Sequence, residues 1–277
     1  MSNFGTTLRV AMDTHGPLCV GIDPHPGLLE AWGVGDTVTG LRRFSLDAIE
    51  ALSGVAAIVK PQVALYERFG SAGFAVLEET LALAKEKNLL TLADAKRGDI
   101  GSTMAAYASA WLSDSSPLAA DAVTLSPYLG YESLRPALDL AAETGRGVFV
   151  LGLTSNPEGP SVQHVGGDAS VAKRIIDAVT AENAQADELG HVGLVIGATV
   201  GDAPAKLGID LAASKAPLLT PGLGAQGATA RDLADSFAGC FSQVLATSSR
   251  DILKAGPDLA ALRARAVAVR EELISVS

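Results

Sequence analysis

Two aspartates and a lysine lie close together in the segment Asp94–Asp99, which reads Asp-Ala-Lys-Arg-Gly-Asp. Asp94 and Lys96 are two residues apart, so on a strand their side chains point to the same side. A lysine between carboxylates has its charged form stabilised, which disfavours the neutral amine that a Schiff base needs. The segment instead favours an ammonium group that protonates a developing carbanion or stabilises it.

Lys60 and Asp99 extend this charged set. Lys60 ends an earlier apolar run, and we expect it to reach the same space from a neighbouring strand. Asp99 lies where the following helix should begin, so its alternative role is an N-cap that accepts from the N–H of Ser102. Buried ion pairs also occur without chemistry, but four partly buried charges are costly together, which favours a functional site. Because Lys60 and Lys96 would repel a divalent cation, we expect no metal here.

Short apolar runs that alternate with helical stretches indicate the frame that positions these charges. Their continuous apolar character is typical of parallel strands covered on both faces. We predict a single (β/α)8 TIM barrel domain over residues 1–277, with an open doubly wound sheet as the alternative. The predicted strands are Leu18–Ile22, Ala56–Val59, Leu89–Ala93, Ala122–Leu125, Val148–Leu153, Val192–Ile196, Ala216–Leu219 and Gln243–Ala246. The predicted helices are Thr37–Ser53, Ala72–Lys87, Thr103–Leu112, Ser133–Thr144, Val171–Leu189, Ala203–Leu207, Ala230–Cys240 and Leu259–Ile274.

Polar or Gly/Pro clusters follow almost every predicted strand. In a (β/α)8 barrel these strand ends converge on one rim, where catalytic groups sit. The glycine-rich segment Pro221–Gly227 follows strand seven and Arg250 follows strand eight, which is where such barrels commonly bind phosphate. Glycine N–H groups can approach an anion there, and Arg250 can bind it through two hydrogen bonds. The irregular segment Asn156–Asp168 is either a lid over this rim or a surface insertion.

Composition argues against several other classes of protein. Of the 277 residues, 48% are hydrophobic and 19% charged, which fits a globular chain with a large core. A net charge of −10 and an aromatic content of 5% argue against nucleic-acid binding.

Cys19 and Cys240 have no zinc-ligand spacing, and we expect two buried thiols. No apolar run reaches the ~18 residues of a membrane span, and residues 1–9 lack a signal-peptide core, so we expect a cytoplasmic protein.

These residues resemble the orotidine 5′-phosphate decarboxylase family. The segment Asp94–Ile100 is similar to that family's Asp-x-Lys-x-x-Asp signature. Its Lys-Arg-Gly-Asp-Ile sequence resembles the bacterial type 2 subgroup. The resemblance implies that orotidine 5′-monophosphate is decarboxylated to uridine 5′-monophosphate and CO2, the last step of de novo pyrimidine biosynthesis. It also implies a homodimer with active sites at its interface and no cofactor. Further matches are Gly21-Ile22-Asp23-Pro24, Lys60-Pro61-Gln62, Thr154-Ser155-Asn156-Pro157, Pro221–Gly227 and Arg250.

The resemblance also implies a role for each matching residue. Lys96 would protonate C6 of the pyrimidine after CO2 departs. Asp94 would lie against the substrate carboxylate, with Lys60 bonded to it and to the ribose. Asp99, accompanied by Thr103, would reach into the active site of the neighbouring subunit. The remaining substrate contacts would be Asp23 to the ribose hydroxyls, Ser155 to the pyrimidine amide, and Gln226 and Arg250 to the phosphate.

Two alternative functions remain open at this point. Sugar-phosphate decarboxylases and aldolases of the same barrel superfamily share the Asp-x-Lys-x-x-Asp pattern. Those enzymes use Mg²⁺ held partly by an acid at the end of strand two, where this chain has Lys60. A catalytically inactive barrel would instead bind uridine monophosphate without turning over orotidine monophosphate.

Overall fold

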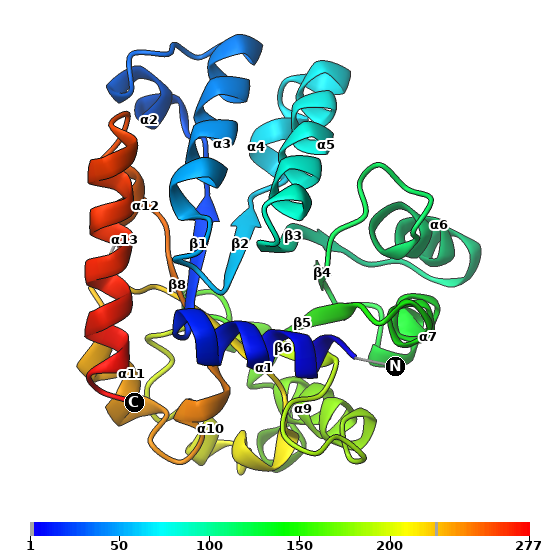
Figure 1. The fold of residues 1–277 in the computed structure, drawn as a ribbon. Coiled ribbons are helices and arrows are strands. Elements are labelled where there is room, and N and C mark those ends of the chain that lie inside the picture. The colour runs from blue at the N-terminus through cyan, green and yellow to red at the C-terminus, as the bar shows by residue number, and fades with distance from the viewer. Residues whose placement is uncertain (1–2, 225–226) are drawn as a thin grey trace.

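Eight parallel strands form a closed barrel in the computed structural model, which describes residues 3–224 and 227–277. Each strand pairs with the next along the chain and β8 pairs with β1, which closes the barrel. Figure 1 shows the strands at the centre of the molecule with the helices around them. The (β/α)8 barrel is therefore confirmed, and the open doubly wound sheet is wrong. The strands are β1 (Leu18–Ile22), β2 (Ile58–Pro61), β3 (Leu90–Arg97), β4 (Ala122–Leu125), β5 (Gly147–Leu153), β6 (Val192–Ile196), β7 (Leu218–Pro221) and β8 (Val244–Ser248).

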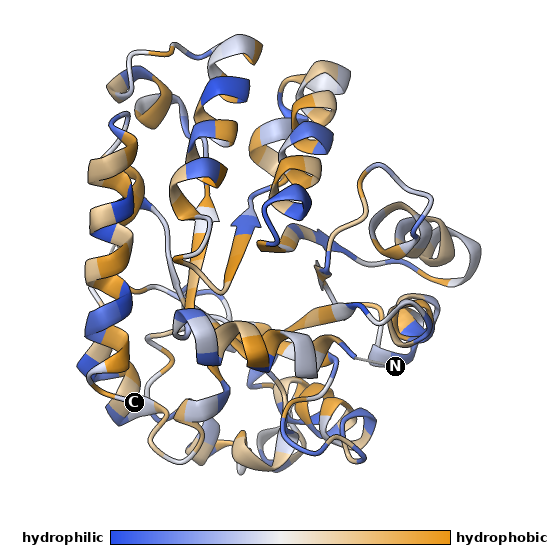
Figure 2. Ribbon diagram, in the orientation of Figure 1, coloured by the Kyte–Doolittle hydropathy of each residue, from blue (hydrophilic) through white to orange (hydrophobic). Residues whose placement is uncertain are grey.

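Helices surround this barrel, and apolar and polar residues alternate along them (Figure 2). The apolar residues of these helices are buried against the barrel. In α3, for example, Leu41, Phe44 and Ile49 are buried at helical spacing. No helix in the two described ranges is long and apolar enough to cross a membrane. The helices are α1 (Phe4–His15), α2 (Pro26–Ala31), α3 (Val38–Leu52), α4 (Ala64–Glu67), α5 (Gly70–Glu86), α6 (Gly101–Leu112), α7 (Arg135–Thr144), α8 (Pro160–Gln163), α9 (Val171–Glu182), α10 (Ala203–Lys206), α11 (Ala230–Ser236), α12 (Arg250–Leu253) and α13 (Leu259–Ile274).

The helix predicted over Val171–Leu189 ends early, at Glu182. Asn183 follows it, and its side-chain amide donates hydrogen bonds of 2.8 and 3.1 Å to the carbonyls of Val192 and Ser214. These long-range bonds fix the chain between α9 and β6, so the helical pattern does not continue. The segment predicted to be irregular after β5 contains the short helix α8.

The helix α1 lies outside the predicted elements and closes the amino-terminal end of the barrel. Phe4, Leu8 and Met12 on one side of it belong to the same buried cluster as the inward-facing strand residues. The ring of Phe4 meets that of Phe149 edge-on, with 5.9 Å between the ring centroids. Figure 1 shows α1 running across this end of the barrel. The charged residues lie at the opposite, carboxyl-terminal end.

Candidate active site

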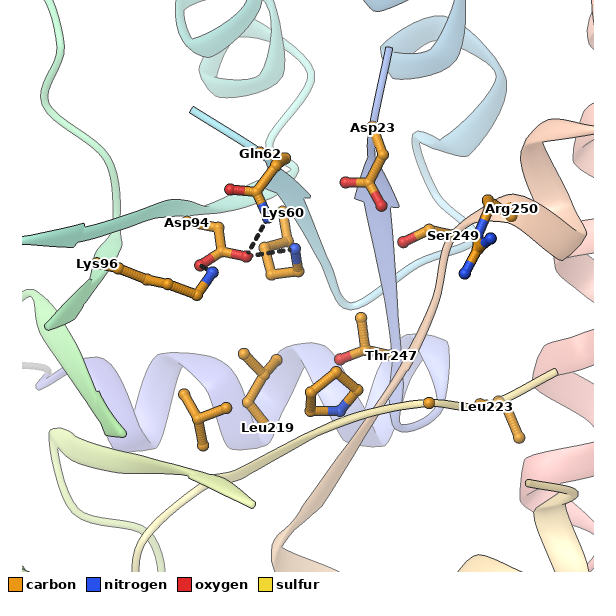
Figure 3. Close-up of a pocket in the computed structure, with 13 residues that line it drawn as sticks. Asp23, Lys60, Gln62, Asp94, Lys96, Leu219, Leu223, Thr247, Ser249 and Arg250 are labelled. Carbon is orange, nitrogen blue, oxygen red and sulfur yellow. Dashed lines mark hydrogen bonds and ion pairs between the residues drawn. The ribbon is translucent and has the colours of Figure 1, made fainter. Parts of the chain in front are cut away.

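A cavity of about 240 Å³ opens at the carboxyl-terminal end of the barrel (Figure 3). Five predicted site residues, carried by β2 and β3 and by the segments after β1 and β8, line it, so the barrel brings them together as expected. Apolar side chains such as Val195 and Leu219 form another part of its wall. The five predicted residues in the lining are Asp23, Lys60, Asp94, Lys96 and Arg250.

Asp94 is the centre of the charged part of this cavity. Its Oδ2 accepts from Lys60 Nζ at 2.8 Å and from Gln62 Nε2 at 2.9 Å. Its Oδ1 accepts from Lys96 Nζ at 2.6 Å and from Thr124 Oγ1 at 2.9 Å. These donors come from β2, from the residue after it, and from β3 and β4, so the carboxylate ties three neighbouring strands together.

The two lysines hold Asp94 in its ionised form. Burial alone would raise the pKa of Asp94, but the charges of Lys60 and Lys96 hold it well below its ordinary range. For Lys60, burial alone would lower the pKa, but Asp94 and then Asp23 raise it above the ordinary value. We therefore expect Asp94 to be a carboxylate and Lys60 an ammonium at neutral pH.

The two lysines differ in their freedom to move. The side chain of Lys60 is only 6% exposed, whereas that of Lys96 is 47% exposed and faces the open cavity. A proton donor must approach the atom that it protonates, and a side chain locked in the wall cannot follow it. Lys96 is thus the better placed donor, and Lys60 is better placed to hold Asp94.

An irregularity in β3 sets the direction in which the Lys96 side chain points. This strand was expected to end at Ala93, but it continues to Arg97 and so contains the charged residues themselves. Between its pairs with β4, β3 spans Ala93 to Arg97 while β4 spans only Val123 to Leu125, which makes a bulge. Lys96 lies in this bulge with φ of +48°, a left-handed conformation that costs a residue with a side chain about 1–3 kcal/mol.

The end of the motif packs away from the cavity. The guanidinium of Arg97 pairs with Glu67, donates to the carbonyl of Ala95 at 2.9 Å, and lies over the ring of Trp111. Gly98 passes so close to the carbonyl of Ser126 that a Cβ there would clash with it. Both residues therefore serve to hold the strand end in place.

Asp23 and Arg250 lie across the cavity from Lys96 in the view of Figure 3. The Oδ1 atom of Asp23 is buried and has no hydrogen-bond partner in the described part of the chain. Arg250 begins α12 after β8, and it forms no ion pair with any other described residue. Ser249, which the sequence did not single out, lines the wall beside them. An unsatisfied carboxylate oxygen and an arginine can bind hydroxyl groups and an anion, respectively.

Three of the predicted residues that the structure describes are not brought into the cavity lining. Asp99 and Thr103 lie beyond the bulge, on the segment that leads into α6. The N-cap alternative for Asp99 is wrong, because Ile100 is the N-cap residue and Asp99 Oδ1 accepts instead from the N–H of Ile100 at 2.7 Å. Ser155 is exposed beside Gly197 at the rim. Gln226 lies outside the described residues.

Two of the four groups that hold Asp94 were given no role from the sequence, namely Gln62 and Thr124. Gln62 stands two residues after Lys60, so strand alternation places both on the same side, and this signal was available. Thr124 is the one polar residue of the run Ala122–Leu125 and is fully buried, but a lone threonine carries little information in a sequence.

Comparisons with known proteins agree on one family. The model of the orotidine 5′-phosphate decarboxylase / HUMPS family matches residues 16–265. A Salinispora arenicola protein named orotidine 5′-phosphate decarboxylase is 56% identical over 268 residues, covering 96% of this chain and 95% of that protein. A Streptomyces avermitilis crystal structure assigned to the same enzyme has a TM-score of 0.95 and 53% identity, covering 100% of this chain and 96% of the other. The Leishmania donovani OMP decarboxylase has a TM-score of 0.78 and 30% identity, covering 100% and 99% of the two chains.

We expect Asp94→Asn to lower the free energy of unfolding by roughly 3 kcal/mol at pH 7, because two lysines lose their carboxylate. The pKa of Asp94 in the folded protein lies below its ordinary value of 3.8, so its ionisation stabilises the fold above that pH. The stabilisation is lost as the pH falls below 3.8 towards the pKa of the folded state. The difference between variant and wild type should therefore shrink in acid, as measured by urea unfolding over a pH series.

The matched control is Asp47→Asn, which removes a surface carboxylate 3.6 Å from Arg43. This change should alter the free energy of unfolding by less than about 0.5 kcal/mol. An Asp94→Asn protein as stable as the control variant would contradict the role assigned to this carboxylate.

Proposed function

The chain belongs to the orotidine 5′-phosphate decarboxylase / HUMPS family, and on that premise we propose that it converts orotidine 5′-monophosphate to uridine 5′-monophosphate and CO2. The observation that carries the proposal is the half-exposed ammonium of Lys96, 2.6 Å from a buried carboxylate at the cavity floor. The end of β2 carries Lys60, whose charge opposes a cation there, which favours decarboxylation over metal-assisted sugar-phosphate chemistry.

In the proposed reaction, the bond between C6 and the substrate carboxylate breaks and CO2 departs. The electron pair of that bond stays on C6, where the ammonium of Lys96 stabilises it and donates a proton. The neutral lysine then recovers a proton from water. Asp94 lies against the substrate carboxylate and keeps Lys96 aimed at C6, while Lys60 holds Asp94 and contacts the ribose.

The far side of the cavity would bind the rest of the nucleotide. We assign Asp23 to the ribose hydroxyls, because its buried Oδ1 lacks a partner among the described residues. We assign Arg250 to the phosphate, together with Gln226, and Ser155 to the pyrimidine amide. Binding energy from the phosphate end can be used to hold the reacting end in the productive geometry.

We further infer that the enzyme is a homodimer in which Asp99 and Thr103 complete the partner's active site. Asp99 forms no ion pair in the described part of the chain. Around it the loops after β3 and β4 expose large apolar side chains: Ile100 is 61%, Tyr128 is 82% and Leu129 is 55% exposed. Exposed apolar groups that gather beside a charged site favour a surface covered by another chain.

Two buried thiols that form no disulfide fit a reducing compartment, and we propose the cytoplasm.

Lys96→Ala should lower kcat for orotidine 5′-monophosphate by about 10³-fold or more, because the proton donor is lost. The assay follows the loss of substrate absorbance with EDTA present. Lys173→Ala, which removes a surface lysine paired with Asp177, should leave the rate unchanged. An active Lys96→Ala enzyme would rule out this proton donor, and a wild-type rate abolished by EDTA would favour the metal-dependent alternative.

Arg250→Ala should raise the KM for orotidine 5′-monophosphate at least tenfold, because a charge-assisted contact to the phosphate is lost. Turnover of orotidine, which lacks the phosphate, should not change. Arg231→Ala, which removes a surface arginine paired with Asp235, is the control. Equal losses for both substrates would show that Arg250 does not bind the phosphate.

Mixing inactive Lys96→Ala with inactive Asp99→Ala should restore activity, because a heterodimer contains one site with both groups intact. Random exchange in a two-fold dimer should restore roughly a quarter of the wild-type activity. The control mixes Lys96→Ala with Asp94→Ala; these two residues lie in one chain's site, so no heterodimer regains a complete site. If the first mixture stays inactive after exchange, Asp99 does not act across an interface.

A further inference from the structure

Thr124 connects the backbone of Lys96 to the side chain of Asp94 through its hydroxyl group. It is fully buried in β4, and its Oγ1 accepts from the backbone N–H of Lys96 at 2.9 Å. The same hydroxyl donates to Asp94 Oδ1 at 2.9 Å. An amide N–H can only donate and an ionised carboxylate can only accept, so both hydrogen bonds have a fixed direction.

These contacts form a closed ring around one carboxylate oxygen. From Asp94 Oδ1 the ring runs through Thr124 Oγ1 to the N–H of Lys96, and along the lysine side chain back to Oδ1. Lys96 lies in the left-handed part of the bulge, where its amide does not follow the regular strand ladder. The hydroxyl of Thr124 thus supplies the acceptor that the kinked backbone requires.

We propose that Thr124 is a positioning residue for Lys96: its hydroxyl holds the bulge in the geometry that keeps the Lys96 ammonium on Asp94 and aimed into the cavity. The inference rests on the proposed function, because it assigns Lys96 the proton transfer. Thr124 itself acts through the lysine and does not line the cavity.

Loss of the Thr124 hydroxyl should loosen Lys96 without releasing the strand end. On the other side of β3, Arg97 still pairs with Glu67 and donates to the carbonyl of Ala95. The contacts of Lys60 and Gln62 with Asp94 Oδ2 also remain. The expected defect therefore lies in the aim of one ammonium group rather than in folding or in nucleotide binding.

Thr124→Val removes the hydroxyl with little change in side-chain shape. It should lower kcat at least about 30-fold, since a misplacement of about 1 Å can cost 10²-fold, and should change KM by less than about threefold. Thr124→Ser restores a hydroxyl and should recover most of the lost kcat. The control Thr220→Val alters a fully buried threonine of β7 that does not line the cavity, and its kcat should match wild type.

Wild type and Lys96→Ala are assayed alongside, and thermal unfolding shows that each variant is folded. A folded Thr124→Val protein with wild-type kcat, a loss confined to KM, or a Thr124→Ser protein as slow as Thr124→Val would overturn the proposal. If Thr124→Val does not fold, Thr124→Ala replaces it with the same expected loss. Absence of turnover by wild type would contradict the proposed function itself, whereas an active wild type with inactive Lys96→Ala and active Thr124→Val contradicts this inference alone.

Discussion

The buried carboxylate of Asp94 is the constraint on which the rest of the site depends. A carboxylate in this position is costly unless its oxygens are satisfied, and four side chains donate to it. Lys60 and Lys96 in turn depend on Asp94, because two ammonium groups this close would otherwise repel each other. Removing Asp94 would therefore leave two ammonium groups side by side without a counter-charge.

The barrel makes this arrangement possible by bringing β2, β3 and β4 side by side in parallel. Since the carboxyl ends of parallel strands meet at one rim, one residue from each strand can reach the same point. The bulge in β3 then adds a second charged residue of the same strand to that point. On the opposite side of the cavity, Asp23 Oδ1 has no hydrogen-bond partner and Arg250 no ion pair among residues 3–224 and 227–277. The cavity thus has one end built around the Asp94 carboxylate and its two lysines, and an opposite end formed by Asp23 and Arg250.

Much of this could be predicted from the sequence because apolar runs and polar strand ends are local signals. The runs defined β1, β4 and β6 to the residue, and the same-side relation of Asp94 and Lys96 followed from their spacing. The bulge could not be predicted, because it depends on how β3 pairs with β4 and not on either strand alone. The hydrogen bonds of Thr124 depend on that same pairing and were missed for the same reason.

Helix α1 and the exact start of α6 could also not be predicted from the sequence. Helix α1 is defined by the open barrel end that it covers, which exists only once the strands have closed. Asp99 has the residue type of an N-cap, but Ile100 takes that position and α6 starts at Gly101, after Gly98 has passed close to the carbonyl of Ser126. In both places tertiary packing decides what local propensity leaves open.

The ionisation of Asp94 can be measured directly by ¹³C NMR of the aspartate carboxyl groups, with Asp94→Asn to assign the signal. We expect the Asp94 carboxyl to remain ionised through pH 3.8 and down to the lowest pH at which the protein stays folded. If the signal assigned to Asp94 titrates at or above pH 3.8, Asp94 is not held as an anion between Lys60 and Lys96, and its central role in the site is wrong.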